Sequence, residues 1–158
     1  MRTPDSVDRL QIDAGAVERL AEHARRVLPQ ESCGVLVGTS SPRCGSRSTS
    51  VVAVVPTENV STGDRRREFA ISPRRVLLEY DRAARSGLDV VGFYHSHPSS
   101  PAIPSREDLE AAWPDSSYLI LGLDPRSAVS LRSWRLAAAA DRFDEELIEI
   151  VGVKRAVR

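Results

Sequence analysis

The sequence predicts an α+β domain, because helical and extended patterns alternate along its 158 residues. Residues 14–28 and 73–86 repeat apolar side chains at helical spacing. Other short runs are rich in Val, Ile, Leu, Phe and Tyr and are bounded by Gly, Pro, Asp or Ser, which is typical of strands. The length and the hydrophobic fraction of 41% suit one domain, residues 1–158, with a single core.

The amino-terminal segment combines a short strand with an amphipathic helix. Residues 1–8 are expected to be flexible, and residues 9–12 to form a short edge strand. Asp13 is a suitable N-cap for a helix over residues 14–28. Pro29 ends this helix, so a short connection leads to the next strand.

The next part of the chain predicts three strands joined by loops. Residues 33–37 form an apolar run that is typical of a buried strand. Residues 39–50 are rich in Ser, Arg, Gly and Pro without periodicity, which predicts a mobile loop inside a hairpin. Residues 51–55 and 67–71 are the next two predicted strands.

A second amphipathic helix is expected after Ser72. This serine is suited to the N-cap, Pro73 to the first helical position, and Gly87 to the position just past the end. The apolar face of the helix consists of Val76, Leu77, Tyr80, Ala83 and Ala84.

The carboxy-terminal part is predicted to contain further strands. Residues 117–123 and 129–136 have strand composition and are joined by a turn at residues 124–127. Residues 137–150 fit a helix, but residues 147–150 fit a final strand equally well.

Two of the three histidines lie close together at the end of a predicted strand. Residues 88–97 are apolar and aromatic and are bounded by Gly87 and Pro98, as expected for a buried strand. Residues i and i+2 of a strand share one face, so His95 and His97 point the same way with Cα atoms roughly 6.7 Å apart. This spacing lets both imidazoles bind one ion.

A carboxylate follows at the start of the next predicted helix. After a proline-rich loop, Ser105 occupies an N-cap position, and Asp108 lies in the first turn of a helix that ends at Trp113. Two imidazoles and one carboxylate leave a coordination position open for water, which is typical of catalytic zinc. The same Ser-x-x-Asp pattern is also a variant of the capping box, and that structural interpretation remains an alternative.

These residues resemble a known signature. The arrangement His95-x-His97, seven residues, Ser105, two residues and Asp108 is similar to that of the JAMM (JAB/MPN-type) zinc metallopeptidases. Residues 29–38 resemble the family's upstream segment and nominate Glu31, and residues 57–59, 68–73 and 118–121 match further segments in the family's order. The resemblance implies a curved mixed central sheet flanked by helices, a cytidine-deaminase-like architecture.

The resemblance also implies a role for each residue. His95, His97 and Asp108 are expected to hold one Zn²⁺ per chain, with Glu31 as general base and Ser105 as a hydrogen-bond donor to the oxyanion. Gly122 stands where many relatives have serine, so a supporting hydrogen bond to the site is expected to be lost.

The family resemblance further implies a substrate. It is an amide at the C-terminus of a ubiquitin-like or sulfur-carrier protein, whose Gly-Gly-type tail would lie along a strand edge. The chain lacks the long insertions of eukaryotic ubiquitin-chain hydrolases. It is similar to compact prokaryotic members, some of which release cysteine or a related group from a sulfur-carrier protein.

Composition argues against several other classes of function. With 22 basic and 22 acidic residues the net charge is zero, so neither nucleic acid nor membrane is expected as a partner, and residues 65–67 are interpreted as a solvated basic loop. No apolar leader or spanning segment is present, and a cytoplasmic location is expected. Cys33 and Cys44 are too few for a disulfide framework, and Cys33 is interpreted as a small buried residue. His23 lies on the polar side of its helix and is interpreted as a surface residue.

Two alternatives from other classes remain open. Many MPN domains have lost their metal ligands and serve only as scaffolds, although every signature residue is present here. The RadC family of DNA-repair-associated proteins shares a His-x-His-Pro-Ser segment, but the segment around Glu31 and the neutral charge disfavour it.

Overall fold

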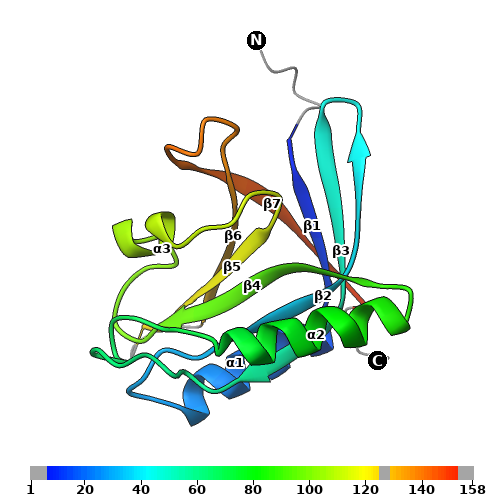
Figure 1. Ribbon diagram of the computed structural model, residues 1–158. Coiled ribbons are helices and arrows are strands. Elements are labelled where there is room, and N and C mark those ends of the chain that lie inside the picture. Colours follow the sequence, from blue (N-terminus) through cyan, green and yellow to red (C-terminus); the bar gives the residue numbers. More distant parts are fainter. Residues whose placement is uncertain (1–6, 125–128, 153–158) are drawn as a thin grey trace, which may run out of the picture.

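The computed structural model describes residues 7–124 and 129–152, and in these ranges seven strands form one mixed sheet that closes into a barrel (Figure 1). The strand order around the barrel is β1-β3-β2-β4-β5-β6-β7. The strands are β1 (Arg9–Asp13), β2 (Cys33–Arg43), β3 (Ser46–Thr57), β4 (Asp89–His97), β5 (Ser117–Gly122), β6 (Ser130–Leu136) and β7 (Phe143–Val151). The helices are α1 (Ala14–Arg26), α2 (Pro73–Arg85) and α3 (Arg106–Glu110).

The α+β class and the mixed sheet are confirmed, but the sheet is closed rather than open. Strand β1, predicted as an edge strand, pairs in parallel with β3 on one side and with β7 on the other. Arg9 lies opposite both Ser48 and Leu147, so β1 has no free edge. The last segment is strand β7, which pairs with β1 and with β6 and so closes the barrel. The helical alternative for residues 137–150 is therefore wrong.

The prediction of a mobile loop at residues 39–50 is also wrong. Strands β2 and β3 continue as a long hairpin up to a tight turn at Cys44 and Gly45, which both have positive φ. The hydroxyls of Ser40 and Thr49 lie 3.3 Å apart across the pair, and the β3 half of the hairpin also pairs with β1. Much of this hairpin is exposed, so its polar composition resembles that of a loop although it is extended.

Residues 67–71, predicted as a strand, are irregular. Their segment runs from β3 to α2 and is held by hydrogen bonds to a side chain rather than by a sheet. Two predictions concern residues that lie mostly outside the described ranges. These are the flexible segment at residues 1–8, of which 1–6 are outside, and the turn at residues 124–127, of which 125–127 are outside.

The two longer helices pack against opposite faces of β2 and β4 (Figure 1). Helix α1 contributes to a cluster of buried residues on one face, and Ala83 of α2 contributes to a cluster on the other. The first cluster contains Leu10, Ile12, Ala16, Leu20, Ala24, Leu36, Val51, Val91, Tyr94, Leu119, Leu121 and Leu123. The second contains Val35, Val37, Ala83 and Val90. Flanking of the sheet by helices is therefore confirmed for α1 and α2, whereas α3 is a short helix beyond the end of β4.

Two predictions about helix faces are corrected. The apolar face of α2 is not fully buried, because Leu77 is 68% and Tyr80 41% exposed. His23 is not a surface residue: it is 5% exposed, and its Nδ1 lies 2.8 Å from the hydroxyl of Tyr94. Burial, with a smaller contribution from Arg26, lowers the pKa of His23, which favours the neutral imidazole; this ring shares a hydrogen bond with the Tyr94 hydroxyl. Among the described residues, no helix has the length and apolarity needed to cross a membrane.

A buried ion pair joins strands β6 and β7. The Nε atom of Arg135 lies 3.0 Å from Oε1 of Glu146, and the hydroxyls of Ser117 and Ser133 also donate to this carboxylate. Arg135 in turn donates to Thr49 of β3. The network therefore connects four strands of the barrel through charged and hydroxyl groups that are away from solvent.

We expect Arg135→Met to lower the free energy of unfolding by about 3–5 kcal/mol, because it leaves the Glu146 carboxylate buried without its cation. The double variant Arg135→Met/Glu146→Gln should recover much of this loss, since it removes the orphaned charge as well. Urea unfolding of the three proteins measures both effects. A loss below about 1 kcal/mol for Arg135→Met would contradict the prediction.

Candidate metal centre

Strand β4 presents its two histidines on the face that is turned away from the first core cluster. A β-bulge between β2 and β4 near Val91 changes the alternation of side chains along β4. Beyond it, Tyr94 packs into the first cluster, whereas Phe93 packs against the second. Because side chains alternate along a strand, His95 and His97 share the face of Phe93.

The structure brings His95, His97 and Asp108 together. The Nε2 atoms of the two histidines are 3.1 Å apart, and they lie 3.3 and 3.5 Å from Oδ2 of Asp108. Both histidines are buried, and the Asp108 side chain is 11% exposed. Three candidate ligand atoms from two elements therefore converge on one point.

The loop between β4 and α3 determines where Asp108 lies. Nδ1 of His97 donates to the carbonyl of Pro101 at 2.7 Å, and the indole of Trp134 donates to the carbonyl of Ala102 at 3.0 Å. Gly122 lies against the same loop, because a Cβ there would be 2.9 Å from the backbone nitrogen of Ala102. The glycine that departs from the family pattern thus allows this loop to approach β5.

The capping box at the start of α3 is confirmed and coexists with the convergence of the three ligand atoms. Oδ2 of Asp108 accepts from the Ser105 N–H at 2.7 Å, and the Ser105 hydroxyl accepts from the Asp108 N–H at 3.0 Å. The same Oδ2 faces both histidines. Capping therefore orients the carboxylate toward the imidazoles, so the two interpretations of the Ser-x-x-Asp pattern are compatible.

The pKa shifts favour a neutral His95 and an ionised Asp108, as metal binding requires, whereas the raised pKa of His97 means that a metal would displace a proton from it. Burial lowers the pKa of His95 and keeps it neutral. Burial also opposes protonation of His97, but Asp108, the Pro101 carbonyl and Glu31 outweigh this effect and raise the pKa of His97. Burial alone would raise the pKa of Asp108, yet hydrogen bonds from His95 and His97 hold it far below its usual range. Two imidazoles and an ionised carboxylate form a donor set that fits zinc with one open position.

Glu31 lies in the predicted connection between α1 and β2 and is buried, with 4% of its surface exposed. Burial raises the pKa of Glu31 to about 7; His97 opposes this shift, and Asp108 and Glu68 add to it. Cys33 lies opposite His95, and the Ser96 N–H donates to the Ser32 carbonyl, so Glu31 adjoins the end of β4 that carries the histidines. A carboxyl group whose pKa is near neutrality can both accept and return a proton.

An apolar groove of about 520 Å³ adjoins the three convergent residues. His95 and Asp108 form part of its lining, together with the exposed side chains of Leu77, Tyr80 and Trp113. The other lining residues are Arg67, Glu68, Phe69, Ala70, Ile71, Pro73, Val76, Phe93, Glu107, Ala111 and Tyr118. Leu77 and Tyr80, two apolar residues of α2 that lie outside the core, therefore line this groove.

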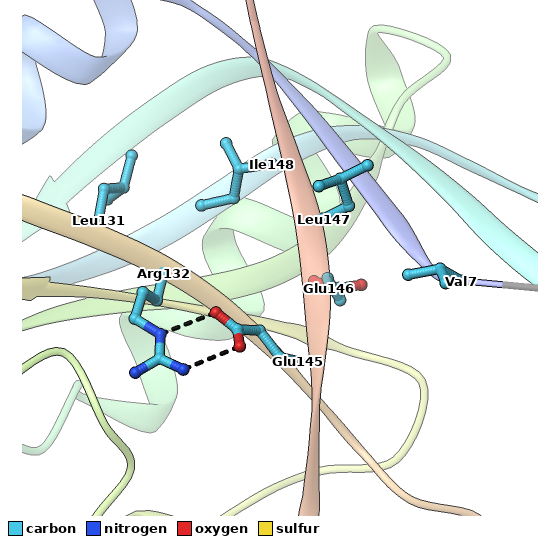
Figure 2. A pocket seen from close by; sticks show the side chains of 7 residues that line it. All are labelled: Val7, Leu131, Arg132, Glu145, Glu146, Leu147 and Ile148. Atoms are coloured by element: carbon cyan, nitrogen blue, oxygen red, sulfur yellow. Dashed lines mark hydrogen bonds and ion pairs between the residues drawn. The ribbon is translucent and has the colours of Figure 1, made fainter. Parts of the chain in front are cut away.

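A second hollow of about 390 Å³ lies beside β6 and β7 and has different chemistry (Figure 2). It is lined by Val7, Leu131, Arg132, Glu145, Glu146, Leu147 and Ile148. Figure 2 shows Arg132 and Glu145 paired through two hydrogen bonds, of 2.7 and 2.8 Å, so their charges are already neutralised. Among its described lining residues there is neither histidine nor cysteine, and we assign no chemistry to it.

Sequence reasoning assigned no role to two residues that lie at the site. The ring of Phe69 stacks on His95 with centroids 4.5 Å apart and an interplanar angle of 23°. Asn59 is buried and hydrogen-bonds the segments that carry Phe69 and Glu31. Both residues belong to segments that resemble the family, and this resemblance was the available signal for them.

Comparison with known proteins agrees with the geometry. Residues 13–137 match the family described as prokaryotic homologues of the JAB domain. The chain is 37% identical over 123 residues to a desampylase of Haloferax volcanii, which spans 75% of this chain and 84% of the relative. It is 32% identical over 144 residues to the CysO-cysteine peptidase of Mycobacterium tuberculosis, which spans 90% of this chain and 91% of the relative. A solution structure from Desulfitobacterium hafniense superposes with a TM-score of 0.74 at 31% identity and covers 89% of this chain and 92% of its own.

Proposed function

The chain belongs to the prokaryotic homologues of the JAB domain, and on this premise we propose that it is a zinc-dependent peptidase. Its substrate is an amide bond at the C-terminus of a ubiquitin-like or sulfur-carrier protein. The observation that carries the proposal is the convergence of His95, His97 and Asp108 beside a buried Glu31, at one end of an apolar groove. This complete donor set disfavours a scaffold that has lost its ligands.

His95, His97 and Asp108 hold the metal. When bound, zinc supplies a Lewis acid and lowers the pKa of its bound water to about 7. The Nδ1–H of His97 donates to the Pro101 carbonyl, which directs the lone pair of Nε2 toward the site. The N–H of Ser105 holds Oδ2 of Asp108 in place.

Glu31 acts as the general base. It removes a proton from the attacking water and later transfers it to the leaving amine, so that its carboxylate is regenerated. Burial and the neighbouring carboxylates of Asp108 and Glu68 raise its pKa into the range that suits both transfers. Glu31 is not a ligand in this proposal, because a fourth protein ligand would occupy the open position.

Ser105 stabilises the oxyanion that forms when the carbonyl is attacked. Its hydroxyl oxygen accepts a hydrogen bond from the Asp108 N–H, which leaves the hydroxyl proton available for donation. Removal of one such donor typically slows an enzyme by roughly 10²- to 10³-fold.

The groove supports a protein tail as the substrate. The names of two relatives describe a desampylase and a CysO-cysteine peptidase. We expect a narrow Gly-Gly-type tail next to the scissile bond. The exposed Leu77, Tyr80 and Trp113 offer apolar contacts to side chains farther along such a tail. The leaving group is either a lysine side chain or a C-terminal cysteine.

We expect about one zinc per purified chain, because three protein ligands and water complete the tetrahedral preference of this ion. His97→Ala should lose the metal and the activity together. Elemental analysis after zinc loading and dialysis measures the stoichiometry. A zinc content near zero in the wild-type protein would overturn the assignment.

Glu31→Gln should bind zinc nearly as well as wild type but lose roughly 10²- to 10⁴-fold in turnover, since glutamine cannot accept the proton. The assay incubates the zinc form with a sulfur-carrier protein bearing a C-terminal cysteine and, separately, with a lysine isopeptide adduct, and follows intact mass. Full activity of Glu31→Gln would remove it from the mechanism. Loss of zinc as complete as in His97→Ala would instead make it a ligand.

Ser105→Ala has two expected effects. Loss of the cap should cost about 1 kcal/mol of stability, and loss of the oxyanion donor should slow turnover roughly 10²-fold while zinc is retained. Thermal melting and turnover rate are measured on one sample. A stability loss with normal turnover in the folded protein would leave Ser105 with capping alone.

A further inference from the structure

The side-chain amide of Asn59 organises the irregular segment between β3 and α2. Asn59 is 6% exposed. Its Nδ2 donates to the carbonyls of Glu68 at 3.0 Å and Glu31 at 3.2 Å. Its Oδ1 accepts from the N–H groups of Ala70 at 3.2 Å and Ser61 at 3.1 Å. One amide therefore satisfies four backbone groups that no sheet ladder satisfies, and its Nδ2 also lies 3.5 Å from the carbonyl of Arg65.

Two of these contacts bracket Phe69. The carbonyl of Glu68 and the N–H of Ala70 belong to the residues on either side of it, and both bind the same amide. The N–H of Val60 adds a bond to the carbonyl of Ala70 at 2.8 Å. The residues on both sides of Phe69 are thus anchored, which limits where its ring can lie.

The ring of Phe69 stacks on His95, a candidate metal ligand whose Nδ1, in the part of the chain that the structure describes, lacks the hydrogen bond that usually orients such a histidine. Nδ1 of His97 donates to the Pro101 carbonyl, whereas Nδ1 of His95 is buried and has no hydrogen-bond partner among the described residues. Metal-binding histidines normally have their second nitrogen fixed by such a bond. For His95 the near-parallel stack on Phe69 takes this place, with a centroid separation of 4.5 Å.

We propose that Asn59 and Phe69 are positioning residues of the metal centre: Asn59 holds Phe69 by its flanking peptide groups, and Phe69 fixes the plane of the His95 imidazole. The same amide holds the backbone of Glu31, so one side chain sets the relative positions of the general base and a metal ligand. This inference rests on the proposed function for its kinetic consequences but not for its metal-binding consequences.

The chemistry of position 59 requires an amide. Aspartate has the same shape but only acceptors, so its oxygen would face the carbonyls of Glu68 and Glu31. Alanine would leave four backbone groups without their partner. Asn59→Asp is therefore the sharper variant, because it reverses the polarity of two contacts and keeps the volume.

Phe69 is tested with a pair of substitutions. Phe69→Leu keeps apolar bulk but removes the stack, and we expect zinc affinity to fall by about 10- to 100-fold, the usual range for loss of a ligand's supporting contact. Phe69→Tyr keeps the aromatic face and should restore affinity close to wild type. Zinc affinity is measured by competition with a chromogenic chelator. The constants kcat and KM are measured on the carrier-protein adducts, and we expect kcat to fall by a larger factor than the factor by which KM changes.

Asn59→Asp should lower zinc affinity in the same assay and should lower kcat more than Phe69→Leu does, because it releases Glu31 as well. Val37→Ala is the matched control: this residue is buried in the second core cluster and lines neither the groove nor the metal centre. It should lower the melting temperature while the zinc affinity of the folded protein stays unchanged.

The outcomes separate this inference from the proposed function. Wild-type zinc affinity in folded Phe69→Leu would overturn the positioning role, whatever the kinetics. Equal loss in Phe69→Leu and Phe69→Tyr would also overturn it, since the aromatic face would then be irrelevant. If Asn59→Asp fails to fold, the zinc affinities of Phe69→Leu and Phe69→Tyr decide whether the stack on His95 positions this ligand. Reduced affinity with rescue by tyrosine, in a protein that cleaves none of the adducts, would support positioning and refute the proposed hydrolysis.

Discussion

The structure depends on the alternation of side chains along β4. One face of this strand must fill the core, where Tyr94 is fully buried, while the other face presents His95 and His97. Both edges of β4 are paired, antiparallel with β2 and parallel with β5, so the strand cannot shift by one residue without exchanging the two faces. Gly34 of β2 permits the packing, because a Cβ there would lie 2.4 Å from the Tyr94 ring.

The remaining functional groups come from irregular segments, and each has a structural contact that holds it there. Asp108 caps α3, Glu31 is bound through its backbone to Asn59 and Arg65, and Phe69 follows a residue held by the same Asn59. Rigid strand geometry thus places the two candidate histidine ligands, and hydrogen-bonded loops place the other groups. Burial shifts the pKa values of Glu31 and His95, whereas hydrogen bonds and neighbouring charges shift those of Asp108 and His97 against the effect of burial.

Local patterns sufficed where the interactions are local, and failed where they depend on distant pairing. The spacing of His95, His97 and Asp108 could be read directly, whereas Glu31 lies more than sixty residues away and was found by family resemblance alone. The hairpin at residues 39–50 was missed because an exposed, polar hairpin has the composition of a loop. His23 is buried because it contacts Tyr94, and Leu77 is exposed because it lines a groove. Helical periodicity reports neither of these contacts.

The parallel pairing of β1 with β7 has a consequence for biosynthesis. Arg9 lies opposite Leu147, so one ladder of the barrel joins the two ends of the described chain. A nascent chain can pair β2 with β3 and β4 as these strands leave the ribosome, but β1 lacks one neighbour until β7 has been made. Closure of such a long loop is slow, and an unpaired edge that persists in the meantime invites association with other chains.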